Sequence, residues 1–298
     1  MAVYNYAEKF EGILAQKYAT SLCSYDLEQS NPQVKFINAQ TIKLPRLTVS
    51  GYKDHTRGTA AGFNTGTLSQ DWEPKKLAHD RDIEFVVDPM DIDETNLVLE
   101  IANIHNTFEE EQAIPEKDSY RFSKLYSELN TYKNTNISTT ALTTANILAE
   151  FDKAMEAMDD AGVPQEGRIL YCTPTVRTLL KNADKIQRDI NVGSGSNAVN
   201  RTVHSLDDVA IKNVPSARMK TKYNFTDGCV ADPSAKQMRF ILIHPSCVVC
   251  RDKYAYMKVF TPGTDSRTGD NYIYQNRAYG DLFLLEKKAD GAYINVEE

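Results

Sequence analysis

The stretch SGYKDHTRGTAAGFNTGTLSQDWEPKKLAHDRD, residues 50–82, decides the architecture of the chain. Glycines are frequent in it and large apolar residues are few, and a structureless connection of this length is uncommon inside a compact domain. Two runs that alternate apolar and polar residues bracket it, around Ile42–Val49 and Ile83–Val87. We therefore predict a long two-stranded arm whose flanking strands pair with each other. An isolated hairpin is marginal in water, so the arm is expected to pack on a neighbouring chain. A floppy surface loop is the alternative.

The distal part of this arm carries the side chains that we expect to contact a neighbouring subunit. They mix aromatic and cationic groups, a composition suited to an interface: Arg57, Phe63, Trp72, Lys75 and Lys76. Trp72 is the only tryptophan of the chain and is the predicted anchor.

Helical patterns lie on both sides of the arm. Apolar residues at helical spacing predict an amphipathic helix from about Tyr4 to Leu22, with Tyr6, Phe10, Ile13 and Leu14 on one face. A second helix is expected to start at Asp91 and to carry the apolar stripe Leu97, Ile101, Ile104 and Phe108. Glu109–Glu111 are read as its solvated end. Pro115 interrupts the pattern, and a shorter helix is predicted for about residues 118–129.

The second half of the chain mixes helices and strands. A helix is expected from near Thr140 to a stop signal at Ala161-Gly162, followed by the strand RILYC and a helix with Thr173 as N-cap. The segment NVGSGSNAVNR, with Gly193 and Gly195, is predicted to be a mobile loop. Further strands are expected in VAIKN, RFILI and the C-terminal tail, which makes the chain α+β.

Composition limits the function classes. The chain has 298 residues, 41% hydrophobic and 25% charged, which is typical of a soluble globular protein. Its net charge of −7 argues against tight nucleic-acid binding, although a wall around packed DNA can be acidic. No run reaches transmembrane length and no signal pattern is present, so folding in a cytosol and no membrane contact are expected.

Candidate chemistry is sparse. Cys247 and Cys250 form a CxxC, but residues three apart in a strand face opposite ways, so we interpret them as two buried small hydrophobes. His244, Ser246 and Asp252 invite a catalytic-triad interpretation, yet no nucleophile elbow accompanies them. We predict no enzyme activity, no cofactor and no metal.

Several phrases, taken in order, resemble the major capsid proteins of tailed bacteriophages, which have the Hong Kong 97-type fold. They are DPMDIDETN, IPEKDSYRFSKL, ILYCTPTVRTLL, VAIKNVPSARM, FILIHPSCVV and RAYGDLFLLEKKADGAYI. The resemblance implies an N-terminal arm at 1–40, an extended two-stranded loop at 41–90, and a long spine helix with a peripheral domain at 91–135. It places the completion of the peripheral domain at about 250–298 and an axial domain at 136–265, with Gly193 and Gly195 in a mobile axial loop.

The resemblance also implies a function and partners. A subunit of this kind self-assembles through pentamers and hexamers into an icosahedral shell around phage double-stranded DNA, with weak non-specific DNA contact. It works with a portal and, we expect, a separate scaffolding protein; it is located in the virion and assembled in the host cytoplasm. Some relatives form a lysine–asparagine isopeptide, but no asparagine and catalytic glutamate can be matched to Lys53, Lys75 or Lys76. The alternatives are an encapsulin-like compartment shell and a soluble α+β enzyme.

Overall fold

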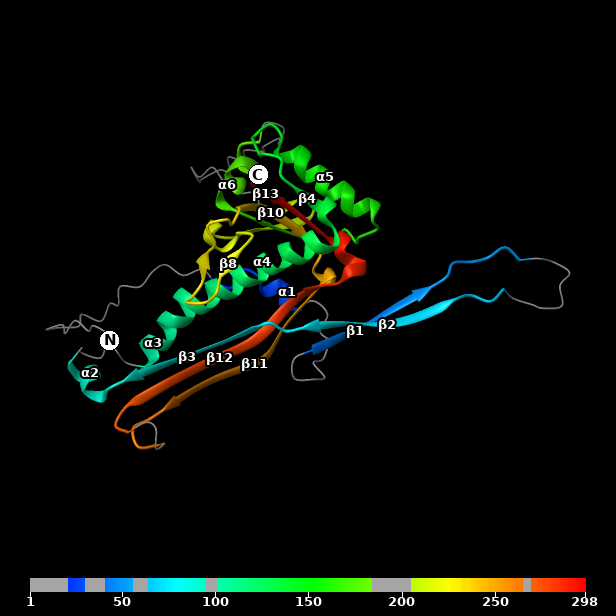
Figure 1. Ribbon diagram of the computed structural model, residues 1–298. Coiled ribbons are helices and arrows are strands. Elements are labelled where there is room, and N and C mark those ends of the chain that lie inside the picture. Colours follow the sequence, from blue (N-terminus) through cyan, green and yellow to red (C-terminus); the bar gives the residue numbers. More distant parts are fainter. Residues whose placement is uncertain (1–20, 30–40, 56–63, 95–100, 184–204, 265–268) are drawn as a thin grey trace, which may run out of the picture.

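The computed structural model of the chain describes residues 21–29, 41–55, 64–94, 101–183, 205–264 and 269–298 (Figure 1). Arg57, Phe63, Gly193 and Gly195, the predicted mobile loop and nearly all of the predicted N-terminal helix lie outside these residues. Within the described residues, no helix is both long and apolar enough to span a bilayer.

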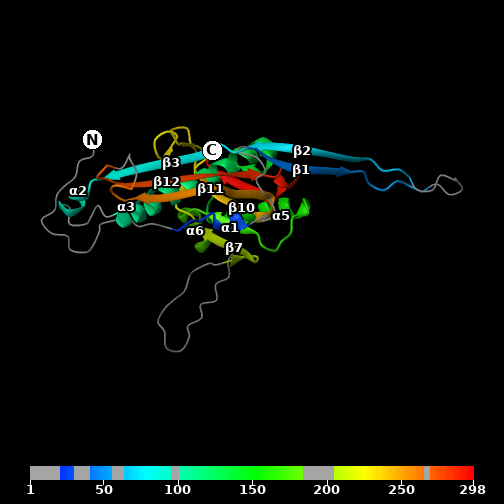
Figure 2. The ribbon, with the colours of Figure 1, turned by 90° about the horizontal axis from the view of Figure 1, so that it is seen from below.

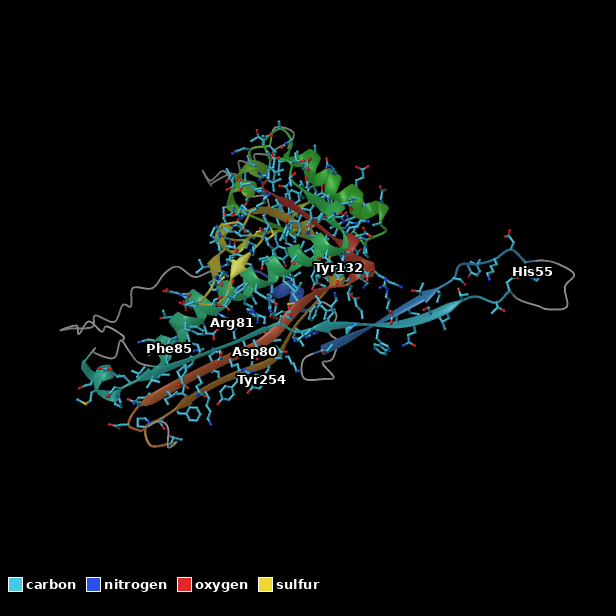
Figure 3. All side chains as sticks on the ribbon, viewed as in Figure 1. His55, Asp80, Arg81, Phe85, Tyr132 and Tyr254 are labelled. Carbon is cyan, nitrogen blue, oxygen red and sulfur yellow. The ribbon has the colours of Figure 1, made fainter. Side chains whose placement is uncertain are left out.

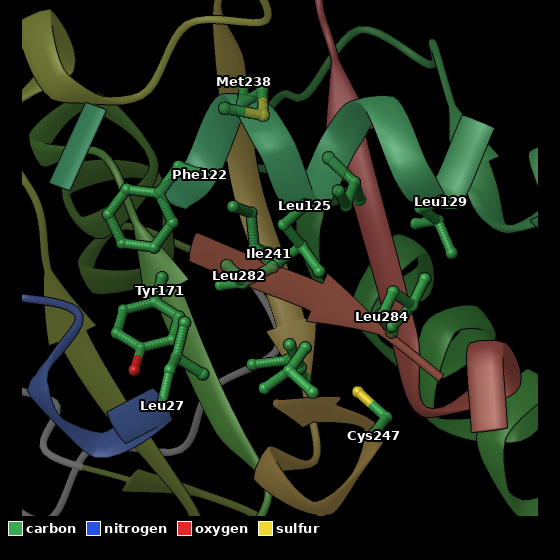
Figure 4. Packing of buried hydrophobic residues seen from close by; sticks show 14 of the residues in the cluster. Leu27, Phe122, Leu125, Leu129, Tyr171, Met238, Ile241, Cys247, Leu282 and Leu284 are labelled. Carbon is green, nitrogen blue, oxygen red and sulfur yellow. The ribbon is translucent and has the colours of Figure 1, made fainter. Parts of the chain in front are cut away.

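A six-stranded sheet forms the core of one half of the molecule. Its order is β4 (Ile137–Ser138), β13 (Ala292–Val296), β10 (Met238–Ile243), β5 (Ile169–Cys172), β7 (Val209–Asn213) and β6 (Ser205–Leu206). The central strands β5 and β10 are apolar on both faces because helices cover both. On one face α5 (Ile147–Asp160) and α6 (Pro174–Lys181) pack, and on the other α1 (Tyr25–Gln29) and α4 (Ile114–Tyr132) pack. Figure 4 shows the buried apolar residues on the face that α1 and α4 cover. There Phe122 and Leu125 of α4 face Tyr171 and Ile241 of the sheet.

One long helical path continues through Pro115, which corrects the prediction that the helix ends at Glu109–Glu111. The path runs from α3 (Ile101–Phe108) through the π-helix η1 (Glu109–Ala113) into α4, and α2 (Pro89–Glu94) precedes it in the chain. Pro115 lies in the first turn of α4, and the wider π turn before it relieves the conflict of its ring with the preceding carbonyls. Glu109 is not simply a solvated end, because its carboxylate accepts a 2.6 Å hydrogen bond from the Asn276 amide.

A three-stranded sheet lies along this helix (Figures 1 and 2). Its order is β11 (Val248–Phe260), β12 (Tyr272–Leu284) and β3 (His79–Val87), all antiparallel. The Tyr274 hydroxyl lies 2.8 Å from Nδ1 of His105 on α3, so this face of the sheet looks toward the helix. The alternating burial of β3 confirms the predicted strand.

A separate hairpin extends from the body (Figures 1 and 2). It consists of β1 (Thr41–Val49) and β2 (Leu68–Lys76), paired from Thr41 opposite Lys76 to Val49 opposite Leu68. The prediction that β1 pairs with the run at Ile83–Val87 was therefore wrong, since that run pairs with β12. Between β2 and β3 the buried Leu77 packs with Phe283, and the Ala78 N–H donates to Asp281. These contacts direct β3 into the three-stranded sheet.

The start and end of α5 and the start of α6 differ in part from the predicted helix boundaries. The helix expected from Thr140 begins only at Ile147, and it ends at the predicted signal. There Gly162 has φ +71°, its N–H donates to the Asp159 carbonyl, and the Val163 N–H donates to the Met158 carbonyl. Thr173 precedes α6 as predicted, but its hydroxyl donates to the Arg239 carbonyl and caps no helical N–H. The remaining short elements are η2 (Asn134–Asn136), η3 (Ser216–Arg218), β8 (Tyr223–Asn224), β9 (Val230–Ala231), η4 (Pro245–Cys247) and η5 (Glu286–Gly291).

Candidate intersubunit interface

The hairpin β1–β2 exposes apolar side chains that no described part of the chain covers. Leu47 and Val49 on β1 and Leu68 and Trp72 on β2 are all exposed, and Tyr52 beyond the ladder is fully exposed. The two strands form a sheet of their own, with no third strand among the described residues. A two-stranded ribbon gains little stability by itself, so these side chains need another surface to pack on.

Cross-strand bonds keep the hairpin closed well beyond its ladder. The Ser50 N–H donates to the Thr67 carbonyl at 3.0 Å, and the Thr67 N–H donates to the Ser50 hydroxyl at 2.9 Å. Further out, Lys53 Nζ donates to the Thr65 carbonyl and the Asn64 amide to the Asp54 carbonyl. From Thr41 to Asp54 an extended strand spans roughly 40 Å, which is far enough to reach a neighbouring molecule. In Figure 3, Tyr132 lies where the hairpin leaves the body and His55 lies toward its far end.

One ion pair and two hydrogen bonds from a lysine connect one edge of the hairpin to η5. The Arg46 guanidinium donates two hydrogen bonds to the Glu286 carboxylate, at 2.8 and 3.2 Å. Lys287 Nζ donates to the Leu47 carbonyl at 2.6 Å and to the Thr48 hydroxyl at 3.0 Å. The direction of the hairpin is therefore set by contacts with the body, although its exposed surface contributes nothing to the core.

Lys75 is part of this root, and its predicted contact with a neighbouring subunit stays a prediction. It is 8% exposed, its ammonium donates to the Tyr132 hydroxyl, and Glu73 Oε1 lies 3.0 Å away. Burial acts to lower the pKa of Lys75, but the bonds to Tyr132 and Glu73 outweigh it, so the pKa lies above its ordinary value. The Lys75 cation is thus engaged within its own chain.

The other predicted contact residues have different positions. Trp72 is 49% exposed and lies opposite Pro45 in the ladder, and Lys76 is exposed at the start of the pairing with β1. Their contact with a neighbour stays a prediction. Sequence reasoning missed the exposed Leu47 and Leu68, because alternation in a strand does not tell which of its faces a core covers.

The other candidate chemistry has structural explanations. Cys247 lies in η4 and Cys250 in β11, both buried, and burial raises the pKa of the Cys247 thiol to about 12 and that of Cys250 to about 11. The His244 ring lies 2.7 Å from the Ser246 hydroxyl, but Asp252 pairs with Lys117 at 2.5 Å, so the three form no triad. In the described part of the chain, no His, Cys, Asp and Glu side chains gather in threes to hold a metal ion.

No protein-family model matches the sequence, and no curated protein matches it. Solved phage capsids, in contrast, are similar over nearly the whole chain. The mature capsid of bacteriophage PhiM1 has a TM-score of 0.69 at 14% identity, covering 98% of this chain and 91% of that chain. The capsid of Cyanophage P-SCSP1u has a TM-score of 0.66 at 13% identity, covering 98% and 93%. The capsid of Myoviridae phage XM1 has a TM-score of 0.58 at 11% identity, covering 98% and 97%.

These similarities establish the architecture of the chain. It has an α+β capsid fold, as the sequence resemblance predicted. More particularly, it is the Hong Kong 97-type capsid fold.

Proposed function

We propose that the chain is the major capsid protein of a tailed bacteriophage, which self-assembles through pentamers and hexamers into an icosahedral shell around double-stranded DNA. The observation that carries the proposal is the hairpin β1–β2, which is fixed to the body at its root and exposes Leu47, Val49, Leu68 and Trp72. A contiguous exposed apolar surface marks an interaction site. The capsid fold supports a second copy of the same chain as its partner.

The two sheets suit the two domains of such a subunit. The six-stranded sheet with α5 and α6 is proposed as the axial domain, and the three-stranded sheet with α3 and α4 as the peripheral domain. In this assignment β11 and β12 run through the peripheral domain, and β13 returns to the axial sheet.

The remaining partners follow from the same proposal. The net charge of −7 fits weak, non-specific contact with packaged DNA. A portal and a separate scaffolding protein are proposed as helpers, with the virion as the final location and the host cytoplasm as the place of assembly. The subunit is proposed to have no catalytic role, since its polar clusters have the structural roles described above.

Imaging and content analysis test this function. The full chain, expressed in bacteria with the other head genes of its phage, is purified and examined by electron microscopy, and the particles are assayed for nucleic acid and protein. We expect closed shells with pentamers and hexamers that contain DNA and a portal. Shells that contain a cargo enzyme and no DNA indicate a compartment protein instead. A monomer at high concentration contradicts the shell function altogether.

A further inference from the structure

The far half of the three-stranded sheet lacks packing on one edge. Cross-strand partners in an antiparallel pair project from the same face, and Met257 pairs with Asn276 while Val259 pairs with Tyr274. Asn276 and Tyr274 bond to the helical path through Glu109 and His105, so all four side chains are on the helix-facing side. Met257 is nevertheless 59% exposed and Val259 42% exposed. Among the described residues, the helix covers β12 and β3 and leaves Met257 and Val259 of β11 exposed.

The helix that faces this sheet is incompletely packed as well. α3 carries the apolar residues Ile101, Ile104 and Phe108, yet none of its residues is buried. An amphipathic helix on a finished surface buries its apolar stripe. Of this stripe, Phe108 lines the same cavity as Met257 of β11, and its ring also packs edge-on against Phe85 of β3.

A cavity marks where the missing packing belongs. It has a volume of about 990 Å³ and lies between the helical path and the sheet. Phe108 and Gln112 line it from the helix and Ala255, Met257 and Ala278 from the sheet. Its lining also includes charged side chains, among them Lys117, Asp252 and Arg277. Ala255 and Ala278 are cross-strand partners on the sheet side of this cavity, and their small side chains fill little of it. Leu22 also lines the cavity, which brings the N-terminal part of the chain to its mouth.

The backbone after Leu22 is held firmly at this place. Asp118, fully buried on α4, accepts hydrogen bonds from the Cys23 N–H at 3.1 Å and the Ser24 N–H at 2.9 Å. Beyond them α1 packs on β11, and its Glu28 lies 3.1 Å from Lys117, which also bonds Asp252 of β11. Cys23 and Ser24, which follow Leu22, are thus held near the Asp252 end of this edge.

We propose that the N-terminal segment, residues 4–20 of the same chain, docks as an amphipathic helix in this groove between α3–η1 and β11. Its apolar residues Tyr6, Phe10, Ile13 and Leu14 share one helical face. Its length also fits: seventeen helical residues span about 25 Å. The strand from Asp252 to Val259 spans roughly 24 Å. Tethering at Leu22 gives this segment a high effective concentration at the groove, which favours it over a second copy.

Neighbouring cysteine substitutions on opposite faces test the docking. Val259→Cys reports the groove, and Lys258→Cys, on the outer face opposite Gln275, is the matched control. Both are made with the partly accessible Cys23 and Cys229 changed to serine. In the full chain we expect alkylation at position 259 to be about tenfold slower than at position 258, because docking must open first.

The apolar face of the segment should be responsible for this protection. Phe10→Ser with Leu14→Ser, which keeps the chain length, and deletion of residues 2–20 should both bring the two alkylation rates together. Equal rates in the unaltered chain overturn the proposal, and so does protection that persists in both variants.

A second readout identifies the chain that supplies the helix. With the segment running from the Asp252 end, Phe10 reaches the level of Met257, so Phe10→Cys with Met257→Cys should form a disulfide within one chain. Disulfide-linked dimers would instead assign the groove to the segment of a neighbouring copy and refute docking in cis. The docking does not depend on the shell function, because both readouts apply equally to unassembled subunits.

Discussion

Shortening the hairpin separates its role in assembly from its role in folding. The variant replaces residues 51–66 with Asn-Gly, which joins Ser50 to Thr67 at a point where the two are already hydrogen-bonded. Every described residue that is removed is exposed, so the variant loses no core contact of residues 51–55 or 64–66. The Asn64–Asp54 bond already closes the hairpin around residues 55–63, so the open loop shrinks from nine residues to two and the entropic cost of closing it falls by about 1.3 kcal/mol. The free energy of unfolding should therefore stay the same or rise by up to that amount.

Assembly should respond differently from folding. Circular dichroism and thermal melting report the fold, and sedimentation with electron microscopy reports the shell. We expect an unchanged or slightly higher Tm together with the loss of closed shells, because Tyr52 and the tip no longer reach a neighbour. Lys53→Ala is the control, since it keeps the hairpin length and removes a single bond to the Thr65 carbonyl. Normal shells from the shortened variant would refute the reasoning, and an unfolded subunit would show that the tip belongs to its own core.

Three further predictions concern stability. Burial and the nearby Arg81 lower the pKa of His79 to about 4, below the value near 6.5 of an unfolded chain. Stability should therefore fall by at most about 3 kcal/mol as pH drops from 6.5 toward 4, and denaturant titrations of His79→Gln should lack this loss. Gly162→Ala meets no atom but keeps φ at +71°, so denaturant titration should show a cost of about 1 kcal/mol. Changing Cys247 and Cys250 to alanine should cost about 1–2 kcal/mol in all and leave shell assembly at low temperature intact, whereas stoichiometric zinc in the unaltered protein would contradict this.

Local patterns predicted much of the fold. The apolar run in β10 and the alternation in β3 identify their strands because burial on two faces or on one leaves a readable pattern. β2 was missed, because exposure of most of its side chains removes that pattern from LSQDWEPKK. With β2 unrecognised, β1 was paired with the next visible strand.

The interface was harder to predict than the fold. Lys75 looks like a surface cation in sequence, and only the fold brings it to Tyr132, 57 residues away along the chain. The prediction that the helix ends before Pro115 was wrong for a similar reason. A π turn placed just before a proline leaves no sequence signal of its own. Trp72 was chosen as an anchor for its chemistry; it is 49% exposed in the subunit, and its contact with a neighbour stays a prediction.

The emission of Trp72 tests the central claim most directly. It is the only tryptophan of the chain and lies on the hairpin, so intrinsic fluorescence reports this one surface in subunits and in shells. If the hairpin packs on a neighbouring subunit, assembly should shift the emission to shorter wavelength and protect it from acrylamide quenching. An emission maximum and a quenching constant that are the same before and after shell closure would contradict the account.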